Sequence, residues 1–241
     1  MIIDGKQIAE EILAGIGDSL RGKRLGIVMG QDDAATQSFI RIKSKVAARL
    51  GVEVVHGGLA ELLASCDGVL VQLPMANSDE LLAQLAPEKD VDGLGPAPAV
   101  LPPVAGAVAE VLARNGTDVV GKKIIVVGAG RLVGKPVAQM LKEMGGEVST
   151  VTSTEGSLED LKTADMVVLG AGSPGFVKPD MLKQGVVLID AGTSESNGKL
   201  AGDADPACAE VASLFTPVPG GIGPIAVAMI FKNLFALSSA K

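Results

Sequence analysis

Short apolar segments alternate with helical patterns along almost the whole chain, and this alternation restricts the fold more than any other feature. Strands that are apolar on both faces are typical of parallel sheets covered by helices on both sides. We therefore predict an α/β protein with two units of mainly parallel sheet. The predicted strands are 24–29, 53–55 and 68–73 in the first half, then 123–127, 147–152, 166–169 and 186–189 in the second.

A loop rich in proline, glycine and aspartate, 87–103, separates the two runs of strands and marks a domain boundary. We predict a first domain over 1–103, completed by a returning C-terminal helix within 224–241, and a second domain over 116–215. The second run has the order expected of a Rossmann-type dinucleotide-binding domain. In this arrangement a cleft is expected between the two domains.

Composition excludes several classes of function. The 241 residues carry a net charge of −7, which argues against a nucleic-acid or anionic-membrane surface. Cys66 and Cys208 lie far apart and lack metal-ligand spacing, so a reduced, cytoplasmic setting is expected. The first residues do not resemble a signal peptide, and we find no stretch of roughly 18 uncharged apolar residues that would span a membrane.

Residues Pro217 to Pro224 hold three prolines and three glycines between apolar flanks. Proline fixes φ and removes an N–H donor, whereas glycine lets another molecule approach the backbone closely. We predict a rigid, non-helical loop that lies against a flat ligand. A structural turn before the last helix is the alternative that this segment alone leaves open.

A glycine-rich turn, Gly128 to Gly134, follows a predicted strand and opens a predicted helix. That context is typical of a dinucleotide site, in which the helix N-terminus receives the pyrophosphate; a generic glycine turn is the alternative. The next strand ends in Ser153, Thr154 and Glu155. The two hydroxyls would tolerate the 2′-phosphate of NADP, with Arg131 as its partner, whereas Glu155 would bind the free hydroxyl of NAD.

Polar residues in apolar surroundings are the candidates for chemistry. Lys43 lies four residues after Phe39, on the same helical face, and suits acid/base work if its ammonium is partly buried; a snorkelling surface lysine is the alternative. Gln72 interrupts an apolar strand near its C-terminal end, so it is either a site residue or a structural amide. Asp90 and Asp92 have no third acidic or histidine ligand nearby, and we predict no metal site.

Together these segments resemble the bifunctional methylenetetrahydrofolate dehydrogenase/methenyltetrahydrofolate cyclohydrolase family over almost the whole chain. Each motif stands in the family's order. The segments that carry the resemblance are the opening Ile2 to Lys6, the Phe39-x-x-x-Lys43 helix, the Val71 to Pro74 strand end, the Lys89 to Gly93 loop, and the Pro217 to Pro224 signature.

The resemblance implies oxidation of 5,10-methylenetetrahydrofolate with NADP, or NAD as second choice, and hydrolysis of the methenyl form to 10-formyltetrahydrofolate. It implies Lys43, Gln72 and Asp92 as catalytic residues, Gln72 bonding to Lys43. It further implies a homodimer with tetrahydrofolate derivatives as its partners. The implied substrate-binding residues are Phe39, Pro219, Gly220 and Gly221, and the implied cofactor-binding residues are Gly128, Ala129, Gly130, Arg131, Thr154 and Thr193.

Three departures from the family pattern keep alternatives open. Phe39 replaces a tyrosine, Gly128-Ala129-Gly130 replaces Gly-Arg-Ser, and the chain is shorter than typical members between Leu50 and Gly68. The alternatives are a dehydrogenase-only member with weakened cyclohydrolase activity, a related two-domain dehydrogenase with another substrate, and a binding protein that has lost catalysis.

Overall fold

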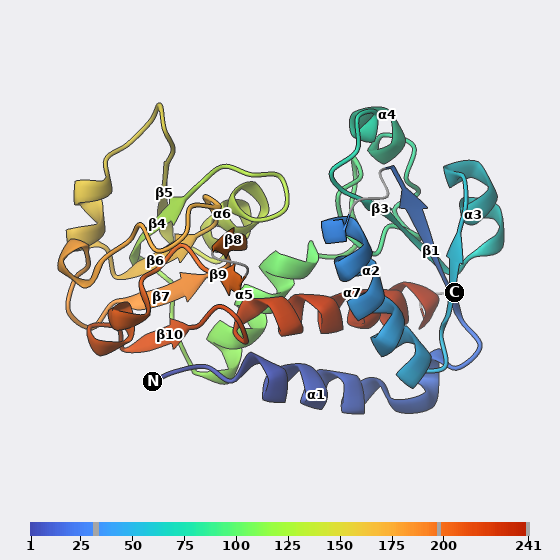
Figure 1. Cartoon of the computed structure of the whole chain (residues 1–241), viewed down its shortest axis with the longest axis horizontal. Helices are drawn as coiled ribbons and strands as arrows, with labels where there is room; N and C mark the ends of the chain where they lie inside the picture. The colour runs from blue at the N-terminus through green and yellow to red at the C-terminus, as the bar shows by residue number, and fades with distance from the viewer. Residues whose placement is uncertain (31–33, 197–198, 240–241) are drawn as a thin grey trace. The chain divides into compact units, whose positions relative to one another are not determined.

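The computed structural model describes residues 1–30, 34–196 and 199–239, and the chain forms two compact units (Figure 1). The three-stranded unit comprises residues 9–103 and 227–241, and the five-stranded unit comprises 1–8 and 104–226. The predicted domain boundary near residue 103 coincides with the change of unit. The first eight residues, predicted to belong to the first domain, group with the five-stranded unit instead.

The three-stranded unit holds a parallel sheet in the order β2-β1-β3, with α2 against β2 and α3 against β1 and β3. β3 is buried at every position, Gln72 included, as its mainly apolar sequence predicts. Its elements are η1 (Gly17–Leu20), β1 (Arg24–Met29), α2 (Ala34–Arg49), β2 (Glu53–His56), α3 (Leu59–Ser65), β3 (Gly68–Gln72) and α4 (Ser78–Leu82). Most of α1 (Gly5–Ile16) and α7 (Ile222–Ser239) also belongs to it, while the first residues of both helices belong to the five-stranded unit.

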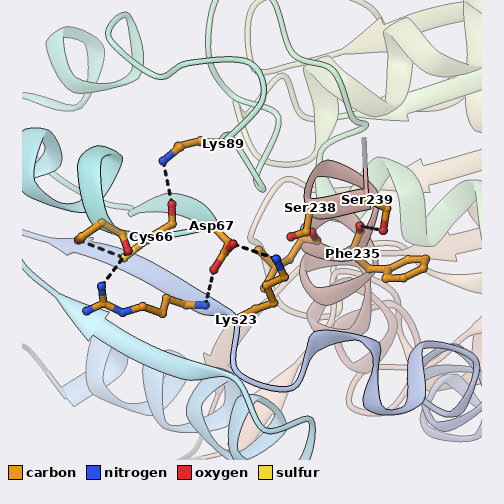
Figure 2. A network of polar contacts seen from close by, with 10 residues as sticks. Lys23, Cys66, Asp67, Lys89, Phe235, Ser238 and Ser239 are labelled. Atoms are coloured by element: carbon orange, nitrogen blue, oxygen red, sulfur yellow. Dashed lines mark hydrogen bonds and ion pairs between the residues drawn. The ribbon is translucent and has the colours of Figure 1, made fainter. Parts of the chain in front are cut away.

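A polar network fixes the segments that lead into β1 and β3 (Figure 2). The Asp67 carboxylate accepts from Lys23 Nζ (3.2 Å) and from the Arg24 backbone N–H (2.9 Å). Lys89 Nζ donates to the carbonyl oxygens of Leu63 and Cys66, where α3 ends. The ammonium of Lys89, the first residue of the Lys-Asp-Val-Asp-Gly motif, is thereby used to hold the fold.

The five-stranded unit holds a fully parallel sheet in the order β10-β7-β6-β4-β5. Numbered along the chain within this sheet, the order is 2-1-3-4-5 read from β5, which is a doubly wound arrangement. Its elements are α5 (Pro103–Arg114), β4 (Lys123–Val127), α6 (Gly134–Glu143), β5 (Glu147–Val151), η2 (Leu158–Thr163), β6 (Met166–Leu169), η3 (Pro179–Met181), β7 (Val187–Asp190), β8 (Ser194–Ser196), β9 (Lys199–Ala201), η4 (Pro206–Glu210) and β10 (Leu214–Thr216).

Aliphatic side chains make up most of both cores, as expected of a chain in which only 2% of residues are aromatic. In the five-stranded unit, Ile125, Val167 and Leu188 from three neighbouring strands are fully buried in one cluster. Burying each such side chain contributes about 1.5–3 kcal/mol relative to leaving it in water. In the three-stranded unit the corresponding cluster joins β1 and β3 to α3 through Val28, Val69 and Leu62.

The structure differs from the sequence predictions in two respects. Residues 222–224 are the first turn of α7 and not part of an irregular loop, because a proline in the first helical turn lacks only an N–H that would have no helical partner. The β8–β9 hairpin and β10 escaped prediction because each strand is only three residues long.

Among the residues that the structure describes, one helix, α7, is long and apolar enough to cross a membrane by length and composition, although half of it is buried within the structure. It includes Lys232, which is why the sequence showed no uncharged span. Ala228, Phe231 and Leu234 are buried, as expected of a core helix in a folded domain.

Candidate functional site

Lys43 and Gln72 meet in the three-stranded unit. Lys43 on α2 donates from Nζ to Gln72 Oε1 at 2.6 Å, and Gln72 stands at the C-terminal end of β3. Gln72 Nε2 in turn donates to the Leu73 carbonyl (2.9 Å), so both ends of this buried amide have partners and its orientation is fixed. The contact that the family resemblance implies between these two residues is present.

Asp92 is the charged neighbour of this pair. Burial lowers the pKa of the Lys43 ammonium, and the Asp92 carboxylate opposes that shift. Burial raises the pKa of Asp92 to about 6, against the attraction of Lys43 and together with repulsion from Asp90. A lysine and an aspartate whose pKa values are both drawn toward neutrality are suited to moving protons near pH 7. The structure thus brings together all three predicted catalytic residues.

A second buried aspartate organises the loop that carries Asp92. Asp90 is fully buried and its Oδ2 accepts from the Gly95 N–H at 2.7 Å, which closes the loop on itself. Burial raises the pKa of Asp90. From α7, Asn233 Nδ2 donates to the carbonyls of Val91 and Leu101, both at 2.9 Å, and so joins both ends of the segment.

Phe39 lies one helical turn before Lys43 on α2, and 48% of its surface is exposed. An exposed aromatic ring four residues from the half-buried Lys43 is suited to stacking on a flat ligand. Phenylalanine provides the ring without the hydroxyl that the family's tyrosine has. Pro74, which follows Leu73 through a cis peptide bond, is also exposed.

The glycine turn after β4 lies at the switch point of the five-stranded sheet, where the chain order departs from β4 toward β5 on one side and β6 on the other. Gly128 adopts φ +98°, and a Cβ at Gly134 would lie 2.0 Å from the Gly128 carbonyl oxygen. A Cβ at Gly130 would meet no atom of the described structure within 4 Å. The turn thus packs backbone on backbone at Gly134, the first residue of α6, and stays open at Gly130, four residues earlier.

These features fit a dinucleotide. Helix N–H groups and a glycine without a covering side chain provide the anion-binding end that a pyrophosphate needs. At the end of β5, Thr152 Oγ1 accepts from the N–H groups of Thr154 (3.3 Å) and Glu155 (3.1 Å), which forms a tight exposed turn. Ser153, Thr154 and Glu155 are all exposed there, as is Arg131 in the glycine turn.

Two buried aspartates, Asp203 and Asp190, hold the loops that follow β6 and β7. Asp203 accepts three consecutive backbone N–H bonds, from Ala171 (2.7 Å), Gly172 (3.1 Å) and Ser173 (2.7 Å). Asp190, the last residue of β7, accepts from Gly192, Asp203 and Ala204 at 2.8–3.2 Å. Burial raises the pKa of Asp190 to about 6, and the charge of Asp203 adds to that shift. Thr193, predicted to bind cofactor, lies exposed in the loop that Asp190 holds.

The Pro/Gly loop packs on the start of the chain within the five-stranded unit. Gly5 N–H donates to the Gly220 carbonyl (2.8 Å), and Gly221 N–H donates to that of Pro217 (2.7 Å). A Cβ at Gly5 would overlap the Gly221 carbonyl oxygen, so the Asp-Gly of the opening motif is needed for this contact. Pro219 is exposed whereas Gly221 is buried, which gives the loop one outward face.

A hollow of about 280 Å³ opens at the amino-terminal ends of the strands of the five-stranded sheet, where β4, β6 and β7 begin. Lys122, Asp165 and Lys183 line it, and Lys183 is paired with Asp165 at 2.6 Å. Ligands of doubly wound sheets bind outside the carboxyl ends of the strands. This hollow lies at the opposite ends of the strands, so it is not the expected site of a dinucleotide. Among the described residues, no group of three or more His, Cys, Asp or Glu side chains could hold a metal ion.

Comparison with known proteins decides the family. Residues 102–241 match the model of the tetrahydrofolate dehydrogenase/cyclohydrolase NAD(P)-binding domain. The bifunctional protein FolD of Staphylococcus aureus strain Newman is 34% identical over a 269-residue alignment that covers 96% of this chain and 94% of FolD. The chain belongs to the tetrahydrofolate dehydrogenase/cyclohydrolase family.

Solved structures of this family have the same fold. The bifunctional FolD methylenetetrahydrofolate dehydrogenase/cyclohydrolase of Campylobacter jejuni superposes with a TM-score of 0.91 at 28% identity, covering 100% of this chain and 99% of that one. FolD of Trypanosoma brucei, solved with NADP and an inhibitor, gives 0.89 at 29% identity, with 100% and 97% covered. The α/β fold of two parallel-sheet units with a Rossmann-type second unit is thereby confirmed.

Sequence reasoning missed several residues that shape the site. The sequence pattern considered Asp90 only as a metal ligand, which it rejected, and gave no role to four further residues, Asp190, Asp203, Thr216 and Asn233. All five are buried polar side chains. The available signal was a polar residue at the end of, or within, an apolar run, as in Val187-Leu188-Ile189-Asp190.

Proposed function

We propose that this protein oxidises 5,10-methylenetetrahydrofolate to the 5,10-methenyl form with NADP, and then hydrolyses the methenyl form to 10-formyltetrahydrofolate. The observation that carries the proposal is the cluster of Lys43, Gln72 and Asp92, with Lys43 Nζ 2.6 Å from Gln72 Oε1. Membership of a family whose relatives carry both activities supports it.

In the hydrolysis, water adds to the amidinium carbon of the methenyl form, and one carbon–nitrogen bond then breaks. The water must lose a proton and the departing nitrogen must gain one. An amine with a lowered pKa can exchange protons in both directions near neutral pH, which is the role we assign to Lys43. Gln72 orients the amine through its fixed amide, and Asp92 sets the lysine's charge state and binds the pterin.

In the oxidation, the bound nicotinamide supplies the acceptor for a hydride from the one-carbon bridge. The chain's part is to bind and orient. We assign pyrophosphate binding to Gly128, Ala129 and Gly130 with the N-terminus of α6, and the 2′-phosphate end to Arg131 and Thr154, with Thr193 on the nicotinamide side. Phe39, Pro219, Gly220 and Gly221 would hold the folate ring system. NAD is the second cofactor to test, because Glu155 suits a free 2′-hydroxyl.

The proposal is tested by initial rates of purified protein with 5,10-methylenetetrahydrofolate and each cofactor in turn. We expect reduction of NADP that depends on the folate, and slower or no reduction of NAD. Turnover of a folate-free panel of hydroxy-acid and amino-acid substrates, with none of the folate, would instead identify a related dehydrogenase with another substrate. Binding of folate without turnover would identify a protein that has lost catalysis.

Phe39 favours one alternative, a dehydrogenase with weakened cyclohydrolase activity. The missing hydroxyl removes a proton donor or acceptor beside Lys43 and leaves the stacking surface in place. Direct assay of methenyltetrahydrofolate hydrolysis separates this alternative from the bifunctional enzyme.

We further propose a cytoplasmic homodimer with no nucleic-acid or membrane partner. The acidic net charge of −7 and the buried half of α7 support the absence of such partners. β5 is an edge strand of the five-stranded sheet and could pair with a second copy. Sedimentation equilibrium of the full chain tests the dimer; a monomer at micromolar concentration would contradict it.

A further inference from the structure

The two loops at the switch point of the five-stranded sheet touch each other directly. A Cβ on Gly128 would lie 2.5 Å from the Gly170 carbonyl oxygen and 3.0 Å from the Ala171 nitrogen. A Cβ on Gly170 would lie 2.5 Å from Val133 Cγ1. The glycine turn after β4 therefore takes its shape partly from the loop that follows β6, residues 170–173.

That loop is exposed, yet its backbone is held from below. Ala171, Gly172 and Ser173 are all exposed residues, but their three consecutive N–H groups donate to one carboxylate, that of the fully buried Asp203. Hydrogen bonds to a charged acceptor are stronger than those between neutral groups. The carboxylate thus fixes the backbone of this loop. The loop lies at the carboxyl ends of the strands, where a doubly wound sheet binds its ligand.

Asp203 is itself held by Asp190. The Asp190 carboxylate accepts from the backbone N–H groups of Asp203 (3.2 Å) and Ala204 (2.8 Å), and from Gly192 N–H (2.9 Å). The Asp190 N–H donates to Thr216 Oγ1 (2.7 Å), at the residue before the Pro/Gly loop. One chain of contacts therefore joins the loops after β6, β7 and β10.

Two glycines leave room for these carboxylates. A Cβ on Gly192 would lie 2.3–2.6 Å from the carboxyl atoms of Asp203. A Cβ on Gly202 would lie 2.2 Å from Asp190 Oδ2 and 2.9 Å from Val218 Cβ in the Pro/Gly loop. The two aspartates and the two glycines form one packed unit, and a side chain at either glycine would displace a carboxylate.

We propose that Asp203, supported by Asp190, is a positioning residue for dinucleotide binding: it holds residues 171–173 in the shape that the glycine turn needs. The inference rests on the proposed use of NADP by this unit. Neither carboxylate needs to touch the cofactor, because the effect passes through the backbone of residues 170–173 to Gly128.

The first test needs no variant. Hydrogen exchange of the full chain without cofactor should show the amides of residues 171–173 protected on the order of a hundredfold or more, although these residues are exposed. Exchange at the rate of an unstructured peptide would overturn the proposal.

The second test uses Asp203→Asn, which keeps the shape but presents an NH₂ group or a neutral oxygen to the three donors. We expect faster exchange at 171–173 and about tenfold weaker binding of NADP by calorimetry, with a matching rise in KM for NADP. KM for methylenetetrahydrofolate and the rate of methenyl hydrolysis should change less than about twofold. Asp180→Asn removes an exposed carboxylate of the same unit and should change none of these quantities.

Gly192→Ala keeps the charge of Asp203 but displaces its carboxylate, so it should weaken NADP binding in the same way and serves if Asp203→Asn fails to fold. Wild-type affinity for NADP in either folded variant would overturn the proposal. If wild-type protein itself binds neither NADP nor NAD, the proposed dinucleotide function fails, and that result is visible before any variant is compared.

Discussion

The candidate site of the three-stranded unit is built from side chains, whereas that of the five-stranded unit is built from backbone groups. In the three-stranded unit the chemistry lies in side chains: the Lys43 amine, the Gln72 amide that it contacts, and the Asp92 carboxylate that acts on the charge of Lys43. In the five-stranded unit it lies in the backbone: glycines allow loops to pack closely, and the N–H groups of residues 171–173 donate to the buried Asp203 carboxylate. Each unit nevertheless has a buried aspartate whose carboxylate accepts hydrogen bonds from the backbone of a site loop: Asp90 in the three-stranded unit and Asp203 in the five-stranded unit.

This difference predicts which substitutions act on which activity. Removing a polar side chain should impair hydrolysis in the three-stranded unit, whereas adding a side chain at a packed glycine should impair cofactor binding in the five-stranded unit. Each activity then serves as the internal control for damage to the other.

The largest effect is expected from Lys43→Met, which keeps the length of the side chain and removes the amine. Hydrolysis of methenyltetrahydrofolate should fall about a thousandfold because no other group at this position can exchange the protons. NADP reduction should persist, with the methenyl form accumulating. Lys45→Met, an exposed lysine on the same helix, is the control; equal losses in both variants would refute the assignment of Lys43.

Gly134→Ala should have the next largest effect, on NADP binding and therefore on NADP reduction. The new Cβ would lie 2.0 Å from the Gly128 carbonyl oxygen, so the turn must shift, at a cost of about 1–3 kcal/mol. Thermal unfolding should occur at lower temperature and NADP should bind more weakly, while hydrolysis persists. Gly130→Ala has room for its Cβ and should leave Tm unchanged. Loss of NADP affinity in Gly130→Ala alone would show that the ligand approaches the backbone there.

Gln72→Leu should lower the hydrolysis rate about tenfold to a hundredfold. The substitution leaves the buried Lys43 amine without its acceptor, which disfavours the ammonium and lowers the pKa of Lys43 further. Rates of hydrolysis across pH measure this, with Gln72→Glu as the opposing variant, since a carboxylate should raise that pKa. Identical pH profiles for the two variants would contradict the coupling.

Asp92→Asn should move the pH profile more than it changes the maximum rate. The Asp92 carboxylate, with its pKa near 6, attracts the Lys43 ammonium and raises that lysine's pKa. Without it the limb of the hydrolysis profile that reports Lys43 should shift to lower pH. A limb that stays in place or shifts upward would show that Asp92 does not act on Lys43.

The smallest effect is expected from Phe39→Tyr, a few-fold rise in hydrolysis with little change in NADP reduction. The hydroxyl adds one donor and acceptor to an exposed ring and leaves the stacking area nearly unchanged. Paired assays of the two activities measure it. A rise of the same size in both would indicate tighter folate binding instead of a change in proton handling.

Much of this arrangement could be predicted from the sequence because its signals are local. The apolar run ending at Gln72, the four-residue step from Phe39 to Lys43 and the glycines opening α6 each lie within one segment. The role of Asp203 could not be predicted from such local signals. Its three donors lie about 30 residues earlier in the chain, and only the folded sheet brings them beneath it. The start of α7 was mispredicted because Gly223 and Pro224 are poor helix formers except in a first turn.

The central claim is that one chain carries out both steps in succession. A single time course of wild-type protein with methylenetetrahydrofolate and NADP tests it, with NADPH and methenyltetrahydrofolate followed together. We predict that NADPH rises while the methenyl form appears only transiently and is replaced by 10-formyltetrahydrofolate. The claim would be contradicted by a time course without NADPH, or by methenyltetrahydrofolate that accumulates in step with NADPH and decays no faster than in buffer.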